Sequence, residues 1–517
     1  MNDLFAKGIK TILVAVVSIC TCGFFLCTNT AWAGAWLGPG DPGFRSDLRL
    51  LVDKGVLDVS TSTWPVSTRD IAGQLISEKS PYDGSPIFRM VPDHLEPHVE
   101  QALKRVRKRV KLEQKPLRSN VKASLANKSR YLRMGNMPAE GSEFSAALDI
   151  NTEYAFARGR LSYVSEPEDG LEWRGDGSYL GLQLGNWALT AGEQNRWWGP
   201  GYDGSLVYSN NARPVPGIAL QRVSGLFPWA DWIDYIQFRS FMGQLESDRP
   251  VPEAKVFAAR LEFSFFDHLE FGFSRSGHWG GENQPESLDN FYDYLIGKES
   301  KEYSGPGEGP TEPGNHLAGY DLRIKVLDNL AMYGQYIGED AQGNLPYSFM
   351  GLFGLEGRMG LGKSGAYLDW YLEYADTLIA PFRPSDNKRV GVAYNHYIYK
   401  DGYRYRGRSL GHTIDGDSRL LSAGTVLIDS RGWTWRLHVS GGTLNKEGSD
   451  RPSVVAPRQD IDIYSADASL KYPITTGHSI TASAGGLQRE YPDSDQRLDG
   501  YFSLTWQKSF DILELLH

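Results

Sequence analysis

From about Arg118 to its end, the sequence alternates apolar and polar side chains with a period of two residues. The clearest runs span residues 144–157, 257–265, 366–374, 433–440 and 501–510. This period is typical of strands, because successive side chains of an extended chain point to opposite faces. The apolar positions are rich in aromatic residues, and the polar positions carry charges. This combination favours strands with one face in lipid and the other in water.

Two fold classes fit such a pattern, a closed barrel in a membrane and a soluble β-sandwich. Aromatic residues make up 12% of the chain, yet its mean hydropathy is only −0.40. After residue 34, no segment approaches the roughly 20 continuous apolar residues of a membrane-spanning helix. We therefore predict an all-β transmembrane barrel over residues 118–517, with roughly 16–18 antiparallel strands at ~10 residues each plus turns and loops.

The N-terminus has the layout of a secretory signal peptide over residues 1–33. Lys7 and Lys10 precede an apolar run, and Ala31-Trp32-Ala33 provides a cleavage site between small residues. The alternative is a single membrane anchor, for which the apolar run is short. All three cysteines lie within this leader, so we expect no disulfide and no thiolate metal site in the mature chain. An exported barrel is expected in the outer membrane of a Gram-negative bacterium.

Residues 34–117 have a helical period instead. Apolar residues recur every three to four positions over 48–57, Ser67 is placed to cap a helix, and Pro97 opens a further helix that reaches residue 111. We expect a small α-helical bundle on the periplasmic side of the barrel. Its last helix carries Lys104, Arg105, Arg107, Lys108, Arg109 and Lys111. These cations are expected to form a solvated face, or to contact anionic lipid or an acidic partner at the periplasmic surface.

Several apparent motifs carry no chemistry. Residues 357–364 fit the phosphate-loop pattern G-x4-G-K-S, but that motif needs a following helix, and residues 366–374 alternate as a strand. We interpret the segment as a glycine-rich hairpin turn. The histidines lack metal-ligand spacing and no catalytic motif stands out, so we expect no catalytic residue, no metal site and no cofactor. The formal net charge of −9 disfavours nucleic acid as a partner.

The most distinctive segment runs from Asn195 to Ile218 and contains the elements Trp-Trp-Gly-Pro and Ser-Asn-Asn-Ala-Arg-Pro. Aromatic faces beside amide and guanidinium donors are suited to sugars, and equally to a plug or constriction inside a barrel. Similar mixtures begin the long polar segment 277–316 and occupy 403–408, and both are expected in extracellular or lumenal loops. The candidate polysaccharide-binding residues are Asn195, Arg196, Trp197, Trp198, Asn210, Asn211, Arg213, His278, Trp279, Tyr403, Arg404 and Arg406.

These segments resemble the capsule-assembly Wzi family. The similarity is carried by residues 195–218, by 254–289 with its His-Trp-Gly-Gly element, and by 391–411, and it extends over nearly the whole mature chain. The resemblance implies an outer-membrane barrel of about eighteen strands with a periplasmic helical bundle. It also implies a lectin, not an enzyme, that holds exported capsular polysaccharide on the cell and helps to organise the capsule.

The expected partners are therefore capsular polysaccharide and the lipids and lipopolysaccharide of the outer membrane. From the residues alone, two other functions remain open. A barrel of this size can enclose a channel for sugars or oligosaccharides. An outer-membrane glycan hydrolase is the other alternative, although nothing in the sequence singles out a catalytic carboxylate pair.

Overall fold

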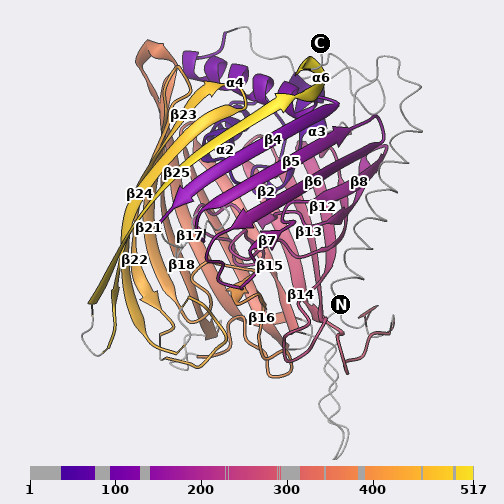
Figure 1. Cartoon of the computed structure of the whole chain (residues 1–517), viewed down its shortest axis with the longest axis vertical. Helices are drawn as coiled ribbons and strands as arrows, with labels where there is room; N and C mark the ends of the chain where they lie inside the picture. The colour runs from indigo at the N-terminus through magenta and orange to yellow at the C-terminus, as the bar shows by residue number, and fades with distance from the viewer. Residues whose placement is uncertain are drawn as a thin grey trace, which may run out of the picture.

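The computed structural model describes residues 36–75, 94–127, 140–227, 229–230, 232–287, 289, 291–292, 315–342, 345–381, 390–446, 448–455, 458–492 and 496–515. The predicted signal peptide, with Ala31 and Ala33, lies outside these residues, as does much of the polar segment 277–316. The described residues form one closed antiparallel β-barrel with helices at one end (Figure 1).

The barrel wall has eighteen strand positions, because β7 and β8 both pair with β6 and share one position. The wall strands are β4 (Leu117–Ala126), β5 (Glu143–Asn151), β6 (Ala155–Val164), β7 (Trp173–Arg174), β8 (Tyr179–Leu184), β9 (Trp187–Gly192), β11 (Gly217–Arg222), β12 (Ile233–Gln244), β13 (Lys255–Phe265), β14 (Leu269–Trp279), β15 (Asn315–Leu327), β16 (Leu330–Gln342), β17 (Leu345–Leu361), β18 (Ala366–Pro381), β21 (Arg419–Ile428), β22 (Thr434–Leu444), β23 (Ile461–Thr475), β24 (His478–Glu490) and β25 (Gln496–Asp511). The last strand, β25, closes the barrel by pairing with β4. The predicted fold class is confirmed.

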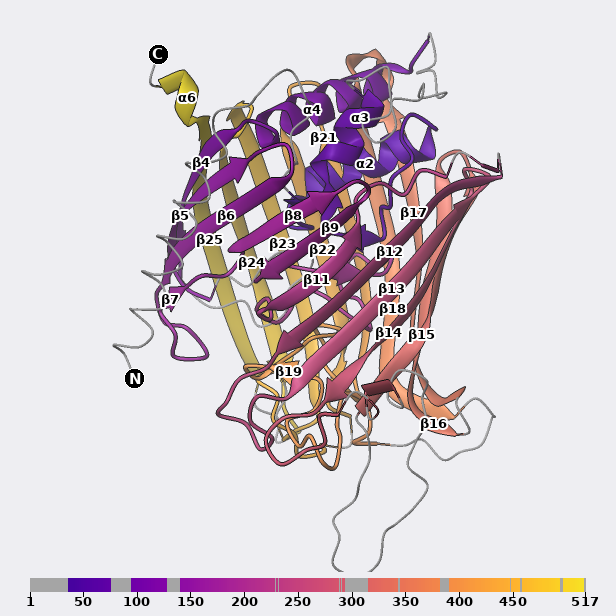
Figure 2. The same cartoon turned by 90° about the vertical axis from the view of Figure 1, so that its right-hand side faces the viewer.

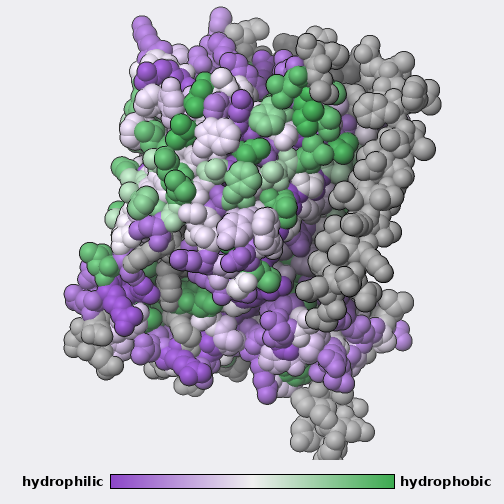
Figure 3. Space-filling view, viewed as in Figure 1, coloured by the Kyte–Doolittle hydropathy of each residue, from purple (hydrophilic) through white to green (hydrophobic). Residues whose placement is uncertain are grey.

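The two faces of the wall differ as the alternation predicted. On β22, Trp435 and Leu437 are exposed on the outside, whereas Arg436 and His438 are buried in the lumen. Apolar side chains cover much of the strand wall, and hydrophilic side chains collect at its lower end (Figure 3). A closed barrel pairs its backbone groups within the wall, so this apolar band can lie in lipid.

The predicted continuous alternation over 144–157 is wrong as a single strand. A tight turn at residues 152–154 separates β5 from β6, and Thr152 closes it by accepting a hydrogen bond from the Ala155 amide at 3.0 Å. The turn changes the phase of the alternation, so Phe156 faces the lumen instead of lipid. The turn contains no Gly or Pro, which is why the pattern concealed it.

The two ends of the barrel differ in the length of their connections. Short turns such as 266–268, 328–329 and 476–477 lie at the end that carries the helices, and so does the chain's C-terminal α6 (Ile512–Leu515). Long segments such as 193–216 and 390–418 join the wall at the opposite end (Figure 2). Outer-membrane barrels keep short turns in the periplasm and long loops outside, so the helical end is periplasmic.

The periplasmic region contains α2 (Pro42–Asp53), α3 (Thr68–Leu75) and α4 (Pro97–Glu113), with the short strands β1 (Trp36–Leu37), β2 (Thr63–Trp64) and β3 (Val66–Ser67). The helices share a core of buried aliphatic residues that includes Leu48, Leu51 and Val106. Ser67 caps α3 as predicted, because its hydroxyl accepts a hydrogen bond from the Asp70 amide. In the described part of the chain, no helix combines the length and apolarity that crossing a membrane requires.

The phosphate-loop pattern at 357–364 is a hairpin turn, as predicted. Residues 357–361 end β17, and the single turn η1 (Gly362–Ser364) leads directly into β18. No helix follows the glycines, so the segment lacks the helix N-terminus that would receive a phosphate.

Candidate functional site

One chain segment crosses the interior of the barrel between β9 and β11. This lumen segment, residues 193–216, carries β10 (Trp197–Trp198), which pairs with β2 of the periplasmic region. Trp197 lies opposite Trp64, and both side chains are 1% exposed. The segment is therefore a plug at mid-barrel, continuous with the packing of the periplasmic region.

The wall holds the lumen segment through hydrogen bonds to its backbone. Glu373 of β18 accepts hydrogen bonds from the Tyr202 and Asp203 amides at 2.7 and 3.0 Å. Gln335 of β16 accepts one from the Leu206 amide at 2.7 Å and donates one to the Trp198 carbonyl at 2.9 Å. These wall residues face the lumen because of the strand alternation, and they satisfy backbone groups that water cannot reach.

Close packing explains one of the glycines in the lumen segment. A Cβ atom at Gly204 would lie 2.1 Å from the ring of His412, so no other residue fits there without a shift. His412 belongs to the second segment that enters the lumen, residues 390–418, which we call the extracellular plug. Burial lowers the pKa of His412 to about 4, so its ring is neutral at physiological pH.

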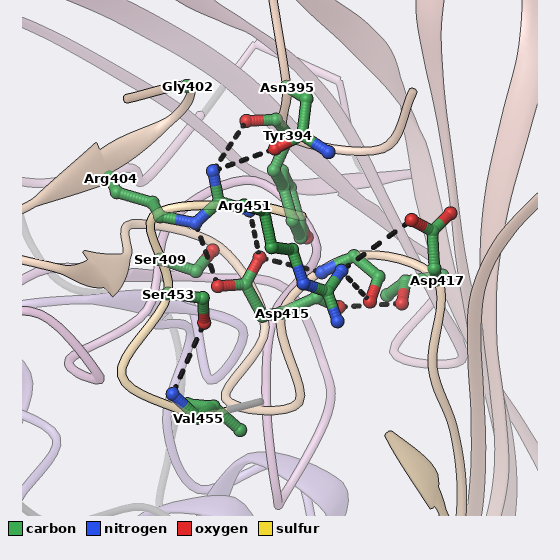
Figure 4. Close-up of polar contacts among 12 residues, drawn as sticks. Tyr394, Asn395, Gly402, Arg404, Ser409, Asp415, Asp417, Arg451, Ser453 and Val455 are labelled. Carbon is green, nitrogen blue, oxygen red and sulfur yellow. Dashed lines mark hydrogen bonds and ion pairs between the residues drawn. The ribbon is translucent and has the colours of Figure 1, made fainter. Parts of the chain in front are cut away.

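The extracellular plug contains β19 (Arg404–Tyr405) and β20 (Arg408–Ser409) and is built around a buried ion pair. Arg404 donates two hydrogen bonds to Asp415, at 2.8 and 2.6 Å, and a third to the Asn395 side chain at 2.9 Å (Figure 4). Burial opposes ionisation of Asp415, but the charges of Arg404 and Arg451 outweigh it and hold the pKa of that carboxyl well below its usual range. The pair fixes the fold of the loop.

The two plugs contact each other directly. The Ser209 amide donates to the Leu410 carbonyl at 2.7 Å, and the Tyr394 hydroxyl donates to the Leu206 carbonyl at 2.8 Å. The Asn211 side chain donates to the Ser409 carbonyl at 3.0 Å. Both segments lie inside the barrel and share one buried core with the wall strands.

The structure places most predicted polysaccharide-binding residues inside this packing. Arg196, Trp197, Trp198, Asn210, Asn211, His278, Trp279, Tyr403 and Arg404 are buried, whereas Asn195, Arg213 and Arg406 are partly exposed. Side chains so fully enclosed offer no face to a polymer in this conformation. Their role as sugar contacts stays a prediction, and what the structure shows for them is packing. His278 and Trp279 also end β14, so the expectation that they begin a loop is wrong.

The arginines in and near these segments are largely paired inside the protein. Arg213 lies between Asp169 at 2.5 Å and Asp176 at 2.6 Å, and Arg408 pairs with Glu168 at 2.7 Å. Burial, with the nearby charge of Asp176, raises the pKa of Glu193 to about 7. Over the described residues, no group of three or more metal-ligating side chains is arranged to hold a metal ion.

The surface of the extracellular plug presents residues that the sequence analysis did not select. The Tyr397 side chain is 54% exposed, Lys400 is exposed, and His396 and Asp401 are partly exposed. The His396 ring lies 4.7 Å from the Tyr397 ring. We call residues 396–401 the extracellular aromatic patch. The sequence contains a signal for this patch, because residues 394–400 mix aromatic and polar side chains as residues 403–408 do.

Comparison with known proteins identifies the family of this barrel. Residues 118–501 match the family model of the capsule assembly protein Wzi. The chain belongs to the Wzi family. The match covers most of the chain, which confirms the resemblance inferred from residues 195–218, 254–289 and 391–411. As a member, the protein is an outer-membrane β-barrel of capsule assembly.

Two relatives of this Wzi-family chain are informative. An uncharacterised 55.8 kDa protein from the cps region of Klebsiella pneumoniae is 29% identical over 420 residues, which are 80% of this chain and 78% of that protein. The solved structure of Wzi from Escherichia coli, an outer-membrane protein involved in group 1 capsule assembly and a carbohydrate-binding β-barrel, is 27% identical. Its superposition has a TM-score of 0.75 and covers 92% of this chain and 99% of that one.

Proposed function

We propose that this protein is an outer-membrane lectin that holds exported capsular polysaccharide at the cell surface and helps to organise the capsule, without catalysing a reaction on it. The observation that carries the proposal is the pair of segments that obstruct the lumen. The lumen segment and the extracellular plug lie inside the barrel and are held by Glu373, Gln335 and the Arg404–Asp415 pair. An obstructed barrel favours binding on its outer face over transport. The carbohydrate binding of Escherichia coli Wzi agrees with this interpretation.

We assign the first sugar contacts to the extracellular aromatic patch, residues 396–401. The exposed Tyr397 ring offers an apolar face for sugar C–H groups, and the His396, Lys400 and Asp401 side chains offer hydrogen-bonding groups for hydroxyls. The buried pair of Arg404 and Asp415 anchors the loop beneath the patch. The predicted site residues then act by positioning this surface. Among the arginines of residues 403–408, Arg406 is the one that is partly exposed to solvent.

Weak binding at each patch is sufficient for this role. A capsular polymer is long and meets many copies of the protein, so each further contact along it is effectively intramolecular. Retention then depends on the number of sites engaged and not on one deep pocket.

Capsule partition tests the proposal. We would delete the gene in an encapsulated host and measure polysaccharide on washed cells and in the culture medium. An unchanged total that shifts into the medium is the expected result. An unchanged partition would overturn the lectin function, and a reduced total would indicate a role in synthesis or export instead. Purified capsule incubated with the protein should keep its chain length, because a glycan hydrolase would shorten it.

The sequence analysis left a channel for sugars open as an alternative function. A single measurement distinguishes that channel from a lectin. Because the two segments obstruct the lumen, we expect the purified protein to stay closed in planar bilayers. Steady single-channel conductance by the unmodified protein would favour a sugar channel over a lectin.

We also propose a membrane contact for helix α4. Arg105 pairs with Asp47 at 2.7 Å, Arg107 donates to the Leu75 carbonyl and Arg109 pairs with Glu113. The remaining cations, Lys104, Lys108 and Lys111, form one exposed stripe on α4, where Lys104 also pairs with the exposed Glu100 at 2.5 Å. These three lysines are the periplasmic lysine stripe.

The place of α4 in the fold favours lipid as the partner of the periplasmic lysine stripe. Pro97, Arg105 and Leu112 lie against the periplasmic turns that follow β17, β21 and β23. The helix therefore runs along the rim of the barrel (Figure 1), where we expect the headgroups of the periplasmic leaflet. Lysines at that depth attract anionic headgroups. An acidic capsule-export partner would use the same lysines, and outer-leaflet lipopolysaccharide would surround the opposite end of the wall.

A further inference from the structure

A cavity lies between helix α2 and the barrel wall, on the periplasmic side of the lumen segment. Its volume is about 30 Å³, enough for two waters or one small oxyanion. Its charged and aromatic lining consists of Arg45, Arg49, Tyr202, Tyr371 and Arg436. Three guanidinium groups therefore face one small space, and none of the described residues that line it has a carboxylate.

The three arginines differ in how their charges are balanced. Arg49 pairs with Glu356 at 2.5 Å, and Arg436 lies 3.6 Å from Asp467. Arg45 has no carboxylate within 4.0 Å among the described residues, although its side chain is buried and the residue is only 6% exposed. A buried charge is costly unless it is paired, so Arg45 is the unbalanced member of the group.

The contacts of Arg45 leave part of its guanidinium unused. Nη2 donates to the Pro200 and Gly201 carbonyls at 3.3 and 2.5 Å, and the group lies 5.0 Å from the centre of the Tyr202 ring. Nε is buried and has no hydrogen-bond partner among the described residues. Burial and the repulsion of Arg49 lower the pKa of Arg45 to about 10, so the group is still charged at physiological pH.

We propose that this cavity is a binding site for a small oxyanion, a carboxylate or a phosphate, that is held by Arg45 with help from Arg49 and Arg436. Guanidinium groups bind both classes through paired, charge-assisted hydrogen bonds. The anion supplies the counter-charge that Arg45 lacks. This inference goes beyond capsule binding and does not depend on it.

The position of the site gives the anion a structural consequence. Arg45 belongs to α2, and its Nη2 donates to carbonyls of the lumen segment. Arg436 belongs to wall strand β22, two residues from the periplasmic start of that strand. A bound oxyanion joins the helix, the lumen segment and the wall at one point, so its binding stabilises the plugged barrel.

Thermal unfolding of the purified full-length barrel in detergent tests the site. We would titrate sodium phosphate or sodium acetate in place of sodium chloride at constant ionic strength and follow the midpoint by tryptophan fluorescence. The expected result is a saturable rise of the midpoint with at least one oxyanion, because binding to the folded state alone shifts unfolding by mass action. A response to phosphate alone identifies a phosphate ligand, and a response to acetate alone identifies a carboxylate ligand.

Two variants locate the effect. Arg436→Gln removes one lining guanidinium without touching the bonds of Arg45 to the lumen segment, and it should raise the half-saturating anion concentration about tenfold. Arg431→Gln, at a periplasmic turn where the side chain is 72% exposed, is the matched control and should leave that concentration unchanged. Arg45→Gln should abolish saturation if the variant folds.

The same titration can overturn the proposal. Arg45 would act only as a clamp for the carbonyls of residues 200–201 if the midpoint did not respond to either anion. An equal response in the wild type, Arg436→Gln and Arg45→Gln would place the effect elsewhere and equally contradict the site.

Discussion

The two halves of the barrel are closed by different physical means. On the periplasmic side, α2, α3 and α4 share an aliphatic core, with residues such as Leu51 and Val106 fully buried. On the extracellular side, irregular loop segments are held by backbone hydrogen bonds and by buried pairs such as Arg404–Asp415. Both closures bury apolar side chains, including Leu206, Tyr394 and Leu410 on the extracellular side, but the second must also supply partners for the backbone groups of its irregular segments. If the closures are separate, single changes should damage one and spare the other.

The largest effect is expected for Arg404→Ala. This change leaves Asp415 buried without its partner, which costs about 3–5 kcal/mol of the stability of the extracellular plug. Hydrogen exchange should report lost protection over residues 390–418, with α2 and α4 unchanged. Arg458→Ala is the control, because its pair with Asp450 is exposed and is worth about 0–1 kcal/mol. Parallel loss of protection in the helices would show that the two closures are one cooperative unit.

A change of similar size is expected on the periplasmic side. Leu51→Ala creates a cavity in the helical core and should cost about 2–5 kcal/mol. Protection of α2 and α4 should fall in hydrogen exchange, while residues 390–418 keep theirs. Leu125→Ala on the exposed outer face of β4 is a control for loss of the same side chain from a position that is not buried in protein. If Leu51→Ala also lowered the protection of residues 390–418, the two closures would be one cooperative unit.

This contrast also explains what the sequence could predict. The barrel follows from alternation along the strands, and the helices follow from their own period, because each pattern reflects burial on one face. The plugs have no period. Trp197, Trp198 and Arg404 have the residue types of a sugar site, and those same types satisfy a buried polar core. Sequence alone therefore selected segments that enter the lumen but could not separate exposed Tyr397 from buried Tyr403, since that difference depends on partners distant in the chain.

Changes to the exposed surfaces should have smaller effects, and the larger of these is expected at the periplasmic end. Replacing Lys104, Lys108 and Lys111 together with glutamine should remove about 1 kcal/mol of attraction to an anionic membrane surface per lysine. Native mass spectrometry from mixed lipids should show less retained phosphatidylglycerol, with phosphatidylethanolamine unchanged. Arg105→Gln is not a clean substitute, because Arg105 also pairs with Asp47. Equal lipid retention in the triple variant would refute the membrane contact of α4.

At the extracellular end, Tyr397→Ala should move part of the capsule from the cell to the medium. One aromatic contact is worth roughly 0.5–1.5 kcal/mol, so each site should lose only a few-fold in affinity, which avidity then amplifies. Tyr154→Ala is the matched control, because Tyr154 is 61% exposed, against 54% for Tyr397, but lies at a periplasmic turn. Partition that changes equally in both variants would mean that the aromatic patch is not the sugar surface.

The response to pH also separates the two ends. Glu193 faces Asp176, Arg213 and Arg406, and burial raises its pKa from 4.5 to about 7. Between those values the folded protein binds more protons at this site than the unfolded chain does, so this contribution to stability falls as pH rises. The thermal midpoint of the wild type should therefore decline more from pH 4.5 to 8 than that of Glu193→Gln.

Asp70→Asn gives the periplasmic counterpart of that measurement. Burial in α3 raises the pKa of Asp70 to about 6, so the same sign applies over a range that ends about one pH unit lower. If the closures are separate, Glu193→Gln should flatten the pH response of hydrogen exchange near residues 193–216, and Asp70→Asn should flatten it in α3. A variant that flattened both regions together would show that protonation at one end is transmitted through the lumen segment to the other.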